Sequence, residues 1–193
     1  NCLSDADTMV VTITPAPGVN AGPDQTVCGN NAVVTLNGNV FGTSTTGIWS
    51  TLGSGIFAPS NTTLNGTYTP SPADILAGTV TLVLSSTNNG GCLVVTDTMI
   101  ITITPAPVVD AGPDIFICTG TMTAALNGNV IGGSTTGTWT TLGSGTFTPN
   151  PNTLNAIYNL STADSLAGVI TLILTSTNNG TCLPESDTVV ITV

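Results

Sequence analysis

The segment GNVFGTSTTGIWSTLGSGIFAPS at residues 38–60 occurs again as GNVIGGSTTGTWTTLGSGTFTPN at residues 128–150. A second pair, LAGTVTLVLSSTNNGGC at 76–92 and LAGVITLILTSTNNGTC at 166–182, has the same offset of 90 residues without a gap. Self-similarity at a fixed period is the signature of a repeat architecture. The chain is therefore a tandem array with a period of about 90 residues.

A third, partial copy opens the chain, because NCLSDADTMVVTITPAP at 1–17 matches GCLVVTDTMIITITPAP at 91–107. We expect residues 1–17 to be the last strand of a preceding repeat, or else a strand donated to a neighbouring chain. Repeat 1 then covers 18–107 and repeat 2 covers 108–193. The Pro-Ala-Pro sequences at 15–17 and 105–107 mark the junctions, and such short linkers favour extended backbone and limit bending.

Each repeat has the pattern of an all-β unit. TVTLVLSS at 79–86 and TMIITIT at 98–104 are rich in β-branched residues with partial alternation, and the Asn-Asn-Gly-Gly sequence at 88–91 between them predicts a hairpin turn. Further strands are expected at 32–37, 46–51 and 64–69, with a turn or one helical turn at 70–78. About seven short strands per 90 residues fit an immunoglobulin-like sandwich. The predicted fold class is all-β, with tandem immunoglobulin-like β-sandwich repeats of about 90 residues.

The charge composition excludes several functions. The 193 residues include no Lys, Arg or His and ten acidic residues, which gives a formal charge of −10. Without basic side chains, neither nucleic acid nor anionic lipid is an expected partner. No apolar run approaches the roughly 18 residues that span a bilayer, so no direct membrane insertion is expected.

The same composition argues against catalysis, since the commonest general base and the nucleophilic lysine are missing. Asp24, Asp74 and Asp97 recur in each repeat, but nothing in the sequence pairs two carboxylates as glycoside hydrolysis requires. We expect no enzyme, no catalytic residue and no cofactor. Asp110 and Asp114 at a junction are weak calcium candidates, because a calcium site gathers more oxygen ligands than two neighbouring aspartates supply. The expected metal content is none.

The five cysteines are Cys2, Cys28, Cys92, Cys118 and Cys182. They form no Cys-x-x-Cys or Cys/His cluster, so they predict disulfides and an oxidising compartment. One possibility is pairing within each repeat, Cys28 with Cys92 and Cys118 with Cys182.

The topology of an immunoglobulin-like sandwich favours another pairing. Cys28 lies about ten residues, or roughly 33 Å, beyond the domain entrance, whereas the hairpin before Cys92 lies at the entrance. A disulfide tolerates a Cα separation of only about 7 Å. In a head-to-tail array, however, Cys28 meets the entrance of repeat 2. We therefore favour an inter-domain bond between Cys28 and Cys182, with Cys2, Cys92 and Cys118 paired outside this segment.

Trp49 and Trp139 occupy the middle of each repeat, where immunoglobulin-like sandwiches place a core tryptophan. The favoured interpretation is that they pack in the core. The alternative is that these tryptophans, together with Tyr68 and its copy, are exposed platforms that stack on sugars.

Four stretches carry a resemblance to a known group of proteins: VNAGPDQTVC at 19–28, WSTLGSGIFAP at 49–59, LNGTYTPSPADILAGTVTLVLSSTNNGGC at 64–92 and SDTVVITV at 186–193. They resemble repeats of giant cell-surface proteins of Bacteroidota, including gliding-motility adhesins and PKD-like or immunoglobulin-like arrays exported by the type IX secretion system. The resemblance implies an extracellular, bacterial cell-surface protein with a fibrous or adhesive role.

The same group has an O-glycosylation pattern, Asp followed by Ser or Thr and then a small or aliphatic residue. The matching positions are Thr8, Thr98, Ser165 and Thr188. The resemblance thus implies candidate glycosylation sites, whereas the structural interpretation is that the aspartates flank or cap the last strand.

The expected function is a structural segment, a stalk or fibre, of a large secreted surface protein or adhesin. Its expected partners are neighbouring repeats or identical chains in a fibre. The alternative is a glycan- or surface-binding module that uses exposed aromatic residues.

Overall fold

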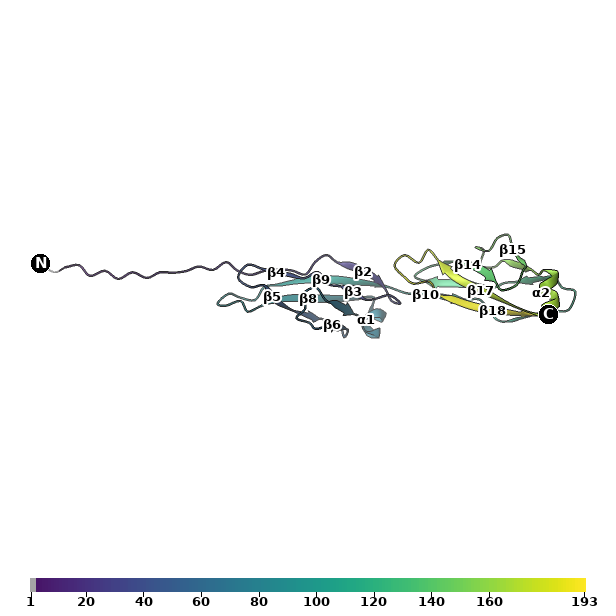
Figure 1. The fold of residues 1–193 in the computed structure, drawn as a ribbon, viewed down its shortest axis with the longest axis horizontal. Coiled ribbons are helices and arrows are strands. Elements are labelled where there is room, and N and C mark those ends of the chain that lie inside the picture. The colour runs from purple at the N-terminus through teal and green to yellow at the C-terminus, as the bar shows by residue number, and fades with distance from the viewer. Residues whose placement is uncertain (1–2) are drawn as a thin grey trace.

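The computed structural model describes residues 3–193. Two β-sandwiches follow one another along one axis, and an extended segment precedes the first of them (Figure 1). The fold is all-β, with one short helix in each sandwich. The predicted fold class, tandem immunoglobulin-like sandwiches, is confirmed.

The elements of the first sandwich are β1 (Gly18–Asn20), β2 (Gln25–Cys28), β3 (Val34–Thr35), β4 (Asn39–Phe41), β5 (Thr46–Thr51), β6 (Ile56–Ala58), β7 (Thr67–Thr69), α1 (Pro72–Ala77), β8 (Thr79–Thr87) and β9 (Thr96–Thr104). Those of the second are β10 (Pro107–Asp110), β11 (Ile115–Phe116), β12 (Thr123–Ala125), β13 (Asn129–Gly132), β14 (Thr136–Thr141), β15 (Thr146–Thr148), β16 (Ile157–Asn159), α2 (Thr162–Ala167), β17 (Val169–Thr177) and β18 (Ser186–Thr192).

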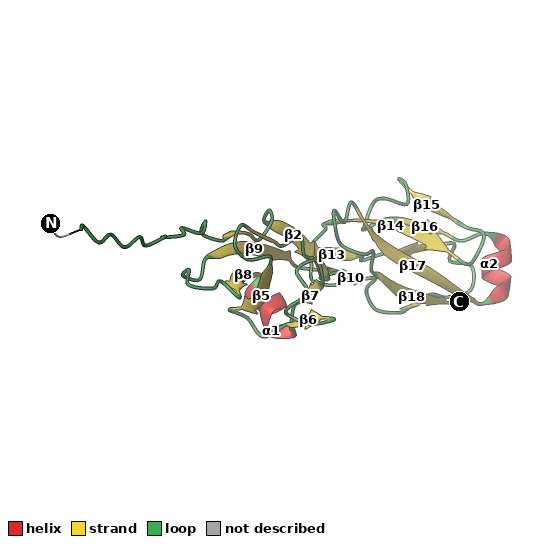
Figure 2. Ribbon diagram, turned by 60° about the vertical axis from the view of Figure 1, so that its left-hand side comes forward, coloured by secondary structure: helices red, strands yellow, loops and turns green. Residues whose placement is uncertain are grey.

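Each sandwich has two main layers (Figure 2). In the first, the four-stranded sheet has the order β2-β9-β8-β5 and faces the three-stranded sheet β3-β7-β6, with β1 and β4 as a separate ribbon. The second sandwich repeats this arrangement as β11-β18-β17-β14, β12-β16-β15 and β10-β13. The strand β2 runs parallel to β9, so that Cys28 lies opposite Thr104 at the far end of the sheet.

The core follows from alternation along the strands. Every second residue of β8 is buried, including Leu82 and Leu84, as a period of two requires. Trp49 and Tyr68 are both 0% exposed, and the indole N–H of Trp49 donates to the carbonyl of Leu64. Trp139 and its neighbours form an equivalent core in the second sandwich. The prediction of exposed sugar-stacking platforms is therefore wrong, because these rings lie inside the sandwiches.

Three local expectations differ from the structure. The strands expected at 32–37 and 64–69 shorten to β3 and β7, because the pairing continues there as irregular backbone bonds from Leu36 to Gly66 and from Gly38 to Leu64. Where a turn or one helical turn was expected at 70–78, the structure has the six-residue helix α1. Each repeat has nine strands instead of about seven, because two strands form a separate ribbon beside the seven strands of the two main sheets.

Candidate functional site

A disulfide joins the two sandwiches. Cys28 ends β2 at the far end of the first sandwich, and Cys182 lies in the loop between β17 and β18 at the entrance of the second. Their sulfur atoms are bonded, with a Cα–Cα distance of 4.9 Å and a sequence separation of 154 residues. Cys28 is fully buried and Cys182 is 9% exposed. The inter-domain pairing favoured from topology is the one that the structure contains, and the alternative pairings within each repeat are wrong.

Hydrogen bonds of Asn30 also cross the junction, close in sequence to the disulfide. The side-chain amide of Asn30 donates to the carbonyl of Leu183 (3.1 Å) and to the carboxylate of Glu185 (2.8 Å). Its carbonyl oxygen accepts from the backbone N–H of Leu183 at 3.1 Å. Asn30 thus makes hydrogen bonds in both directions across the junction. No motif in the sequence points to Asn30, although the change to Gly at the equivalent position 120 is a visible signal.

The linker is short and held on both sides. β9 ends at Thr104 and β10 begins at Pro107, so only two residues lie outside strands. Gly29 N–H donates to the Thr104 carbonyl at 2.9 Å, and Gly133 N–H donates to the Ala106 carbonyl at 3.3 Å. A Cβ at Gly133 would lie 2.3 Å from the carbonyl oxygen of Pro105. Only glycine allows this loop of the second sandwich to approach the linker so closely.

At its entrance, the first sandwich makes the same contacts to the preceding linker that the second sandwich makes at the internal junction. The thiol of Cys92 lies 3.8 Å from the Thr14 hydroxyl and 3.9 Å from the Pro15 carbonyl. Cys182 Sγ lies 3.9 Å from the hydroxyl of Thr104 and 3.5 Å from the carbonyl of Pro105, the residues equivalent to Thr14 and Pro15. Cys92 therefore stands where Cys182 stands, without a bonded partner among the residues described.

Cys118 is equivalent to Cys28 and is exposed at the far end of the second sandwich, with no bonded partner within residues 3–193. Cys2 lies outside the described residues. That these three cysteines pair outside this segment stays a prediction.

A second cluster, around Asp74, occurs once in each sandwich. Ser71 caps helix α1 with a reciprocal capping box, in which its hydroxyl accepts from Asp74 N–H and its own N–H donates to Asp74 Oδ2. The Tyr68 hydroxyl donates to the same oxygen at 2.9 Å, and Ser54 N–H donates to Oδ1 at 3.0 Å. The Ser-x-x-Asp pattern at 71–74 was a sequence signal for this cap.

These hydrogen bonds set the ionisation of the cluster. Burial alone would raise the pKa of Asp74, but the donors from Ser71, Ser54 and Tyr68 outweigh it and hold the pKa below the ordinary value. Burial, and then the neighbouring carboxylate, raise the pKa of Tyr68. The pKa of Asp164 is lowered by the equivalent donors, against the same effect of burial. The carboxylates of Asp74 and Asp164 are therefore ionised, and each accepts several hydrogen bonds.

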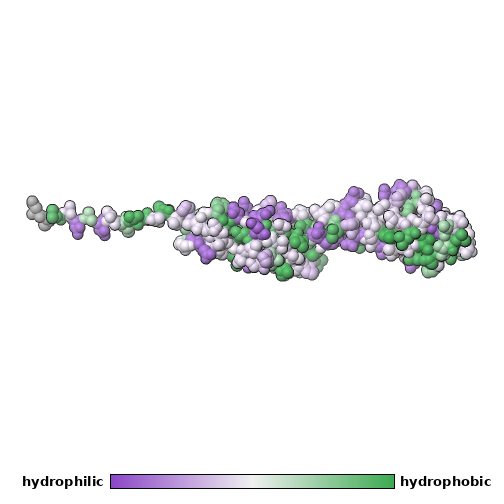
Figure 3. Space-filling model, in the orientation of Figure 1, coloured by the Kyte–Doolittle hydropathy of each residue, from purple (hydrophilic) through white to green (hydrophobic). Residues whose placement is uncertain are grey.

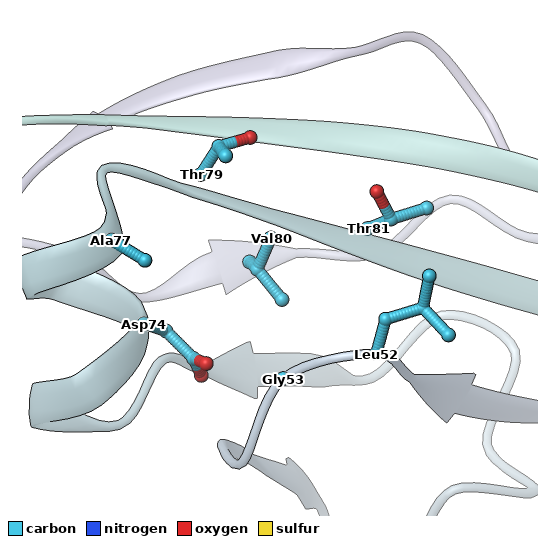
Figure 4. A pocket seen from close by; sticks show the side chains of 7 residues that line it. All are labelled: Leu52, Gly53, Asp74, Ala77, Thr79, Val80 and Thr81. Carbon is cyan, nitrogen blue, oxygen red and sulfur yellow. The ribbon is translucent and has the colours of Figure 1, made fainter.

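A small open pocket of about 240 Å³ lies beside this cluster and is drawn in Figure 4. Asp74 is the one acidic group that lines it, and its oxygens accept the donors described above. A Cβ at Gly53 would lie 2.2 Å from Asp74 Oδ1, so the loop packs directly on the carboxylate. The pocket offers no pair of reactive groups, and the cluster serves to hold α1 and the loop at 53–55 together.

The remaining aspartates named from the sequence bind backbone within their own sandwich. Asp24 accepts from Ile100 N–H and Asp97 accepts from Ala21 N–H, each at 2.8 Å. Asp114 accepts from Val190 N–H at 2.9 Å, and Asp110 accepts from Gly112 N–H at 2.8 Å. Within residues 3–193 no three His, Cys, Asp or Glu side chains gather as a metal site, and the calcium candidates do not converge with a third carboxylate.

The candidate glycosylation residues lie in different surroundings. Thr8, Thr98 and Thr188 are exposed, the last two on β9 and β18. Ser165 is half-buried in α2, next to the buried Asp164. Modification of these residues stays a prediction. In the described part of the chain, no helix has the length and apolar character needed to cross a bilayer.

Comparison with solved structures supports the fold. An I-band fragment of titin aligns with a TM-score of 0.53 and 13% identity over 94% of this chain, and an E-to-A variant of a three-domain titin fragment with 0.52 and 12% over 94%. A mouse cadherin-23 fragment gives a TM-score of 0.47 and 15% identity over 92% of this chain. This chain spans 66% of each of these three chains, just under two thirds.

No protein-family profile matches the sequence, and no curated protein gives a significant match. At such low identities the titin fragments indicate a tandem immunoglobulin-like fold, which the geometry above shows directly.

Proposed function

We propose that this chain is a structural segment of a stalk or fibre, in which successive sandwiches at 18–107 and 108–193 are locked end to end. The larger protein would be an extracellular adhesin or related surface protein of the Bacteroidota type, exported by type IX secretion, as the sequence resemblance implies. Its partners are neighbouring repeats of the same kind. The observation that carries the proposal is the Cys28–Cys182 disulfide between the sandwiches.

The restraints at the junction support the role of a stalk or fibre segment. A disulfide, the hydrogen bonds of Asn30 and a two-residue linker all restrain the same interface. Interfaces between domains of one chain usually allow relative motion unless they are extensive. A covalent bond across the interface restricts that motion without needing a large apolar area.

The bond also supports an extracellular location. Disulfides persist in oxidising compartments and are rare in the cytosol. A chain with ten acidic residues and no basic ones does not favour an anionic lipid surface. The carboxylates of Asp24, Asp74 and Asp97 accept hydrogen bonds from their own sandwich, and that of Glu185 accepts across the junction, which supports a structural role over a catalytic one.

The test is the flexibility of the junction. Electron microscopy of single molecules is expected to give a narrow distribution of angles between the two sandwiches in the oxidised chain. The variant Cys28→Ser with Cys182→Ser is expected to broaden this distribution. The variant Cys92→Ser with Cys118→Ser is the matched control, and it is expected to leave the distribution unchanged. A freely hinged parent chain would overturn the proposal.

A further inference from the structure

We infer that residues 6–13 are the last β-strand of another sandwich of this same repeat type, and that this sandwich lies directly before Gly18 in the stalk. The inference rests on the proposed structural role and names the partner of the first sandwich's entrance. Residues 3–13 lie extended and outside both sandwiches (Figure 1), and hydrophobic residues are spread along them (Figure 3).

The segment exposes side chains that its copy buries. Met9, Val11 and Ile13 are 85%, 69% and 89% exposed. Their equivalents in β9, Met99, Ile101 and Ile103, are 0%, 0% and 3% exposed. Alternate apolar residues on an extended segment form the inward face of a strand. An extended segment with such a face and unpaired backbone groups is ready to pair with the edge of another sheet.

The surroundings of β9 define that sandwich. β9 lies between β8, to which it is antiparallel, and β2, to which it is parallel. Without its last strand, such a sandwich presents two edges with unpaired backbone groups, into which an extended segment can add as a strand. The carboxylate of Asp97 on β9 accepts from Ala21 N–H, and Asp7 occupies the equivalent position in the segment.

The entrance of the first sandwich agrees with this placement. Pro15-Ala16-Pro17 repeats the linker at 105–107, so a sandwich closed by residues 6–13 would precede Gly18 as the first sandwich precedes Val108. The thiol of Cys92 already contacts Thr14 and Pro15 as Cys182 contacts Thr104 and Pro105. The preceding sandwich would then bring its equivalent of Cys28 to Cys92.

A truncated chain tests whether the second sandwich can accept residues 6–13 of another copy as its last strand. Removal of residues 186–193 deletes β18 and leaves Cys182 and the junction in place. Residues 6–13 of a second copy should then fill the gap, with Met9 at the place of the buried Val189 and Val11 at that of Ile191. The expected result is linear oligomers by size-exclusion chromatography and electron microscopy. A monomer would overturn the inference.

A cross-link reports the register. In the same truncated chain with Cys2→Ser, oxidised glutathione is expected to join Cys118 of one copy to Cys92 of the next. The two thiols lose two protons and two electrons, one S–S bond forms, and one oxidised glutathione becomes two reduced molecules. A ladder on non-reducing gels that Cys92→Ser abolishes would support the register. Oligomers without this bond would overturn it.

A matched pair of variants separates the inward from the outward face. Val11→Asp in the truncated chain is expected to abolish assembly, because the charge would enter the core. Val10→Asp is expected to assemble, because its equivalent Ile100 is 45% exposed in β9. Equal assembly of both variants would overturn the inference.

A chimera covers the case in which the truncated sandwich does not fold. Residues 186–193 of the otherwise complete chain are replaced by residues 6–13, ADTMVVTI. Cooperative unfolding of both sandwiches, as in the parent, would support a closing strand, and loss of the second transition would overturn it. These tests do not depend on the distribution of junction angles that tests the proposed function, so either proposal can fail alone.

Discussion

The first sandwich buries Trp49 and Tyr68 where the second buries Trp139 and Tyr158, and both tyrosines donate to a buried aspartate at 2.8–2.9 Å. The capping box, the helix and the sheet order also repeat without change. Each sandwich therefore has its own hydrophobic core and its own set of sheets.

The ends of the sandwiches differ. Asn30 at the exit of the first sandwich has Gly120 as its equivalent, and Glu185 at the entrance of the second has Val95. The Thr43 hydroxyl donates to the Pro15 carbonyl, whereas the equivalent of Thr43 in the second sandwich is a glycine. These differences lie where a sandwich meets its neighbour. The comparison teaches that core residues determine the fold of each repeat, and end residues determine how repeats join.

The largest effect is expected in the shared core. Trp49→Ala should destabilise the first sandwich by about 3–5 kcal/mol, because it removes a fully buried indole and leaves a cavity. Urea unfolding followed by the fluorescence of Trp139 should show an unchanged second sandwich, while circular dichroism shows the earlier loss of the first.

The control for this core prediction is Leu52→Ala, since Leu52 is 78% exposed and should change little. Equal loss of both sandwiches in Trp49→Ala would contradict the independence of their cores.

A smaller effect is expected at the shared carboxylate. Asp74→Asn should cost roughly 2–3 kcal/mol at neutral pH, because hydrogen bonds to a buried charge are weakened. The folded-state pKa of Asp74 lies below its unfolded value of about 3.9, so this stability is present above that pH and is lost as pH falls through the folded pKa. Thermal unfolding between about pH 2 and 6 measures it.

The matched variant Asp164→Asn should produce the same loss in the second sandwich, since its carboxylate has equivalent donors. A parent stability that does not fall on acidification would argue against the lowered pKa.

The smallest effect is expected at the ends. Asn30→Gly, which copies position 120, should weaken the junction by about 1 kcal/mol through loss of the hydrogen bonds to Leu183 and Glu185. The equilibrium of the Cys28–Cys182 disulfide with glutathione should shift toward the thiols about fivefold.

The reciprocal change, Gly120→Asn, serves as the control, because it lies outside the internal junction and should leave this equilibrium as it is. If Asn30→Gly had no effect, the polar contact would not contribute to the joining of the sandwiches.

Much of this architecture could be predicted from local pattern. The alternation at 79–86 and 98–104 predicted β8 and β9, and the 90-residue period predicted that both sandwiches share one fold. The irregular pairing near Leu36 was missed, and the helix at Pro72–Ala77 was expected only as one of two possibilities, because isolated backbone hydrogen bonds and a short capped helix leave little periodicity to detect.

The sequence by itself determined the repeat length, the inward-facing residues of the long strands and the absence of basic groups, because each of these is a local or compositional property. Only the tertiary structure decided between the disulfide pairings that the sequence left open, and it alone identified the partners of Asn30. Cys28 and Cys182 are 154 residues apart and meet because two sandwiches stack end to end. Asn30 reaches Leu183 for the same reason. Side chains in loops have no period, so their contacts depend on how complete domains are placed in space.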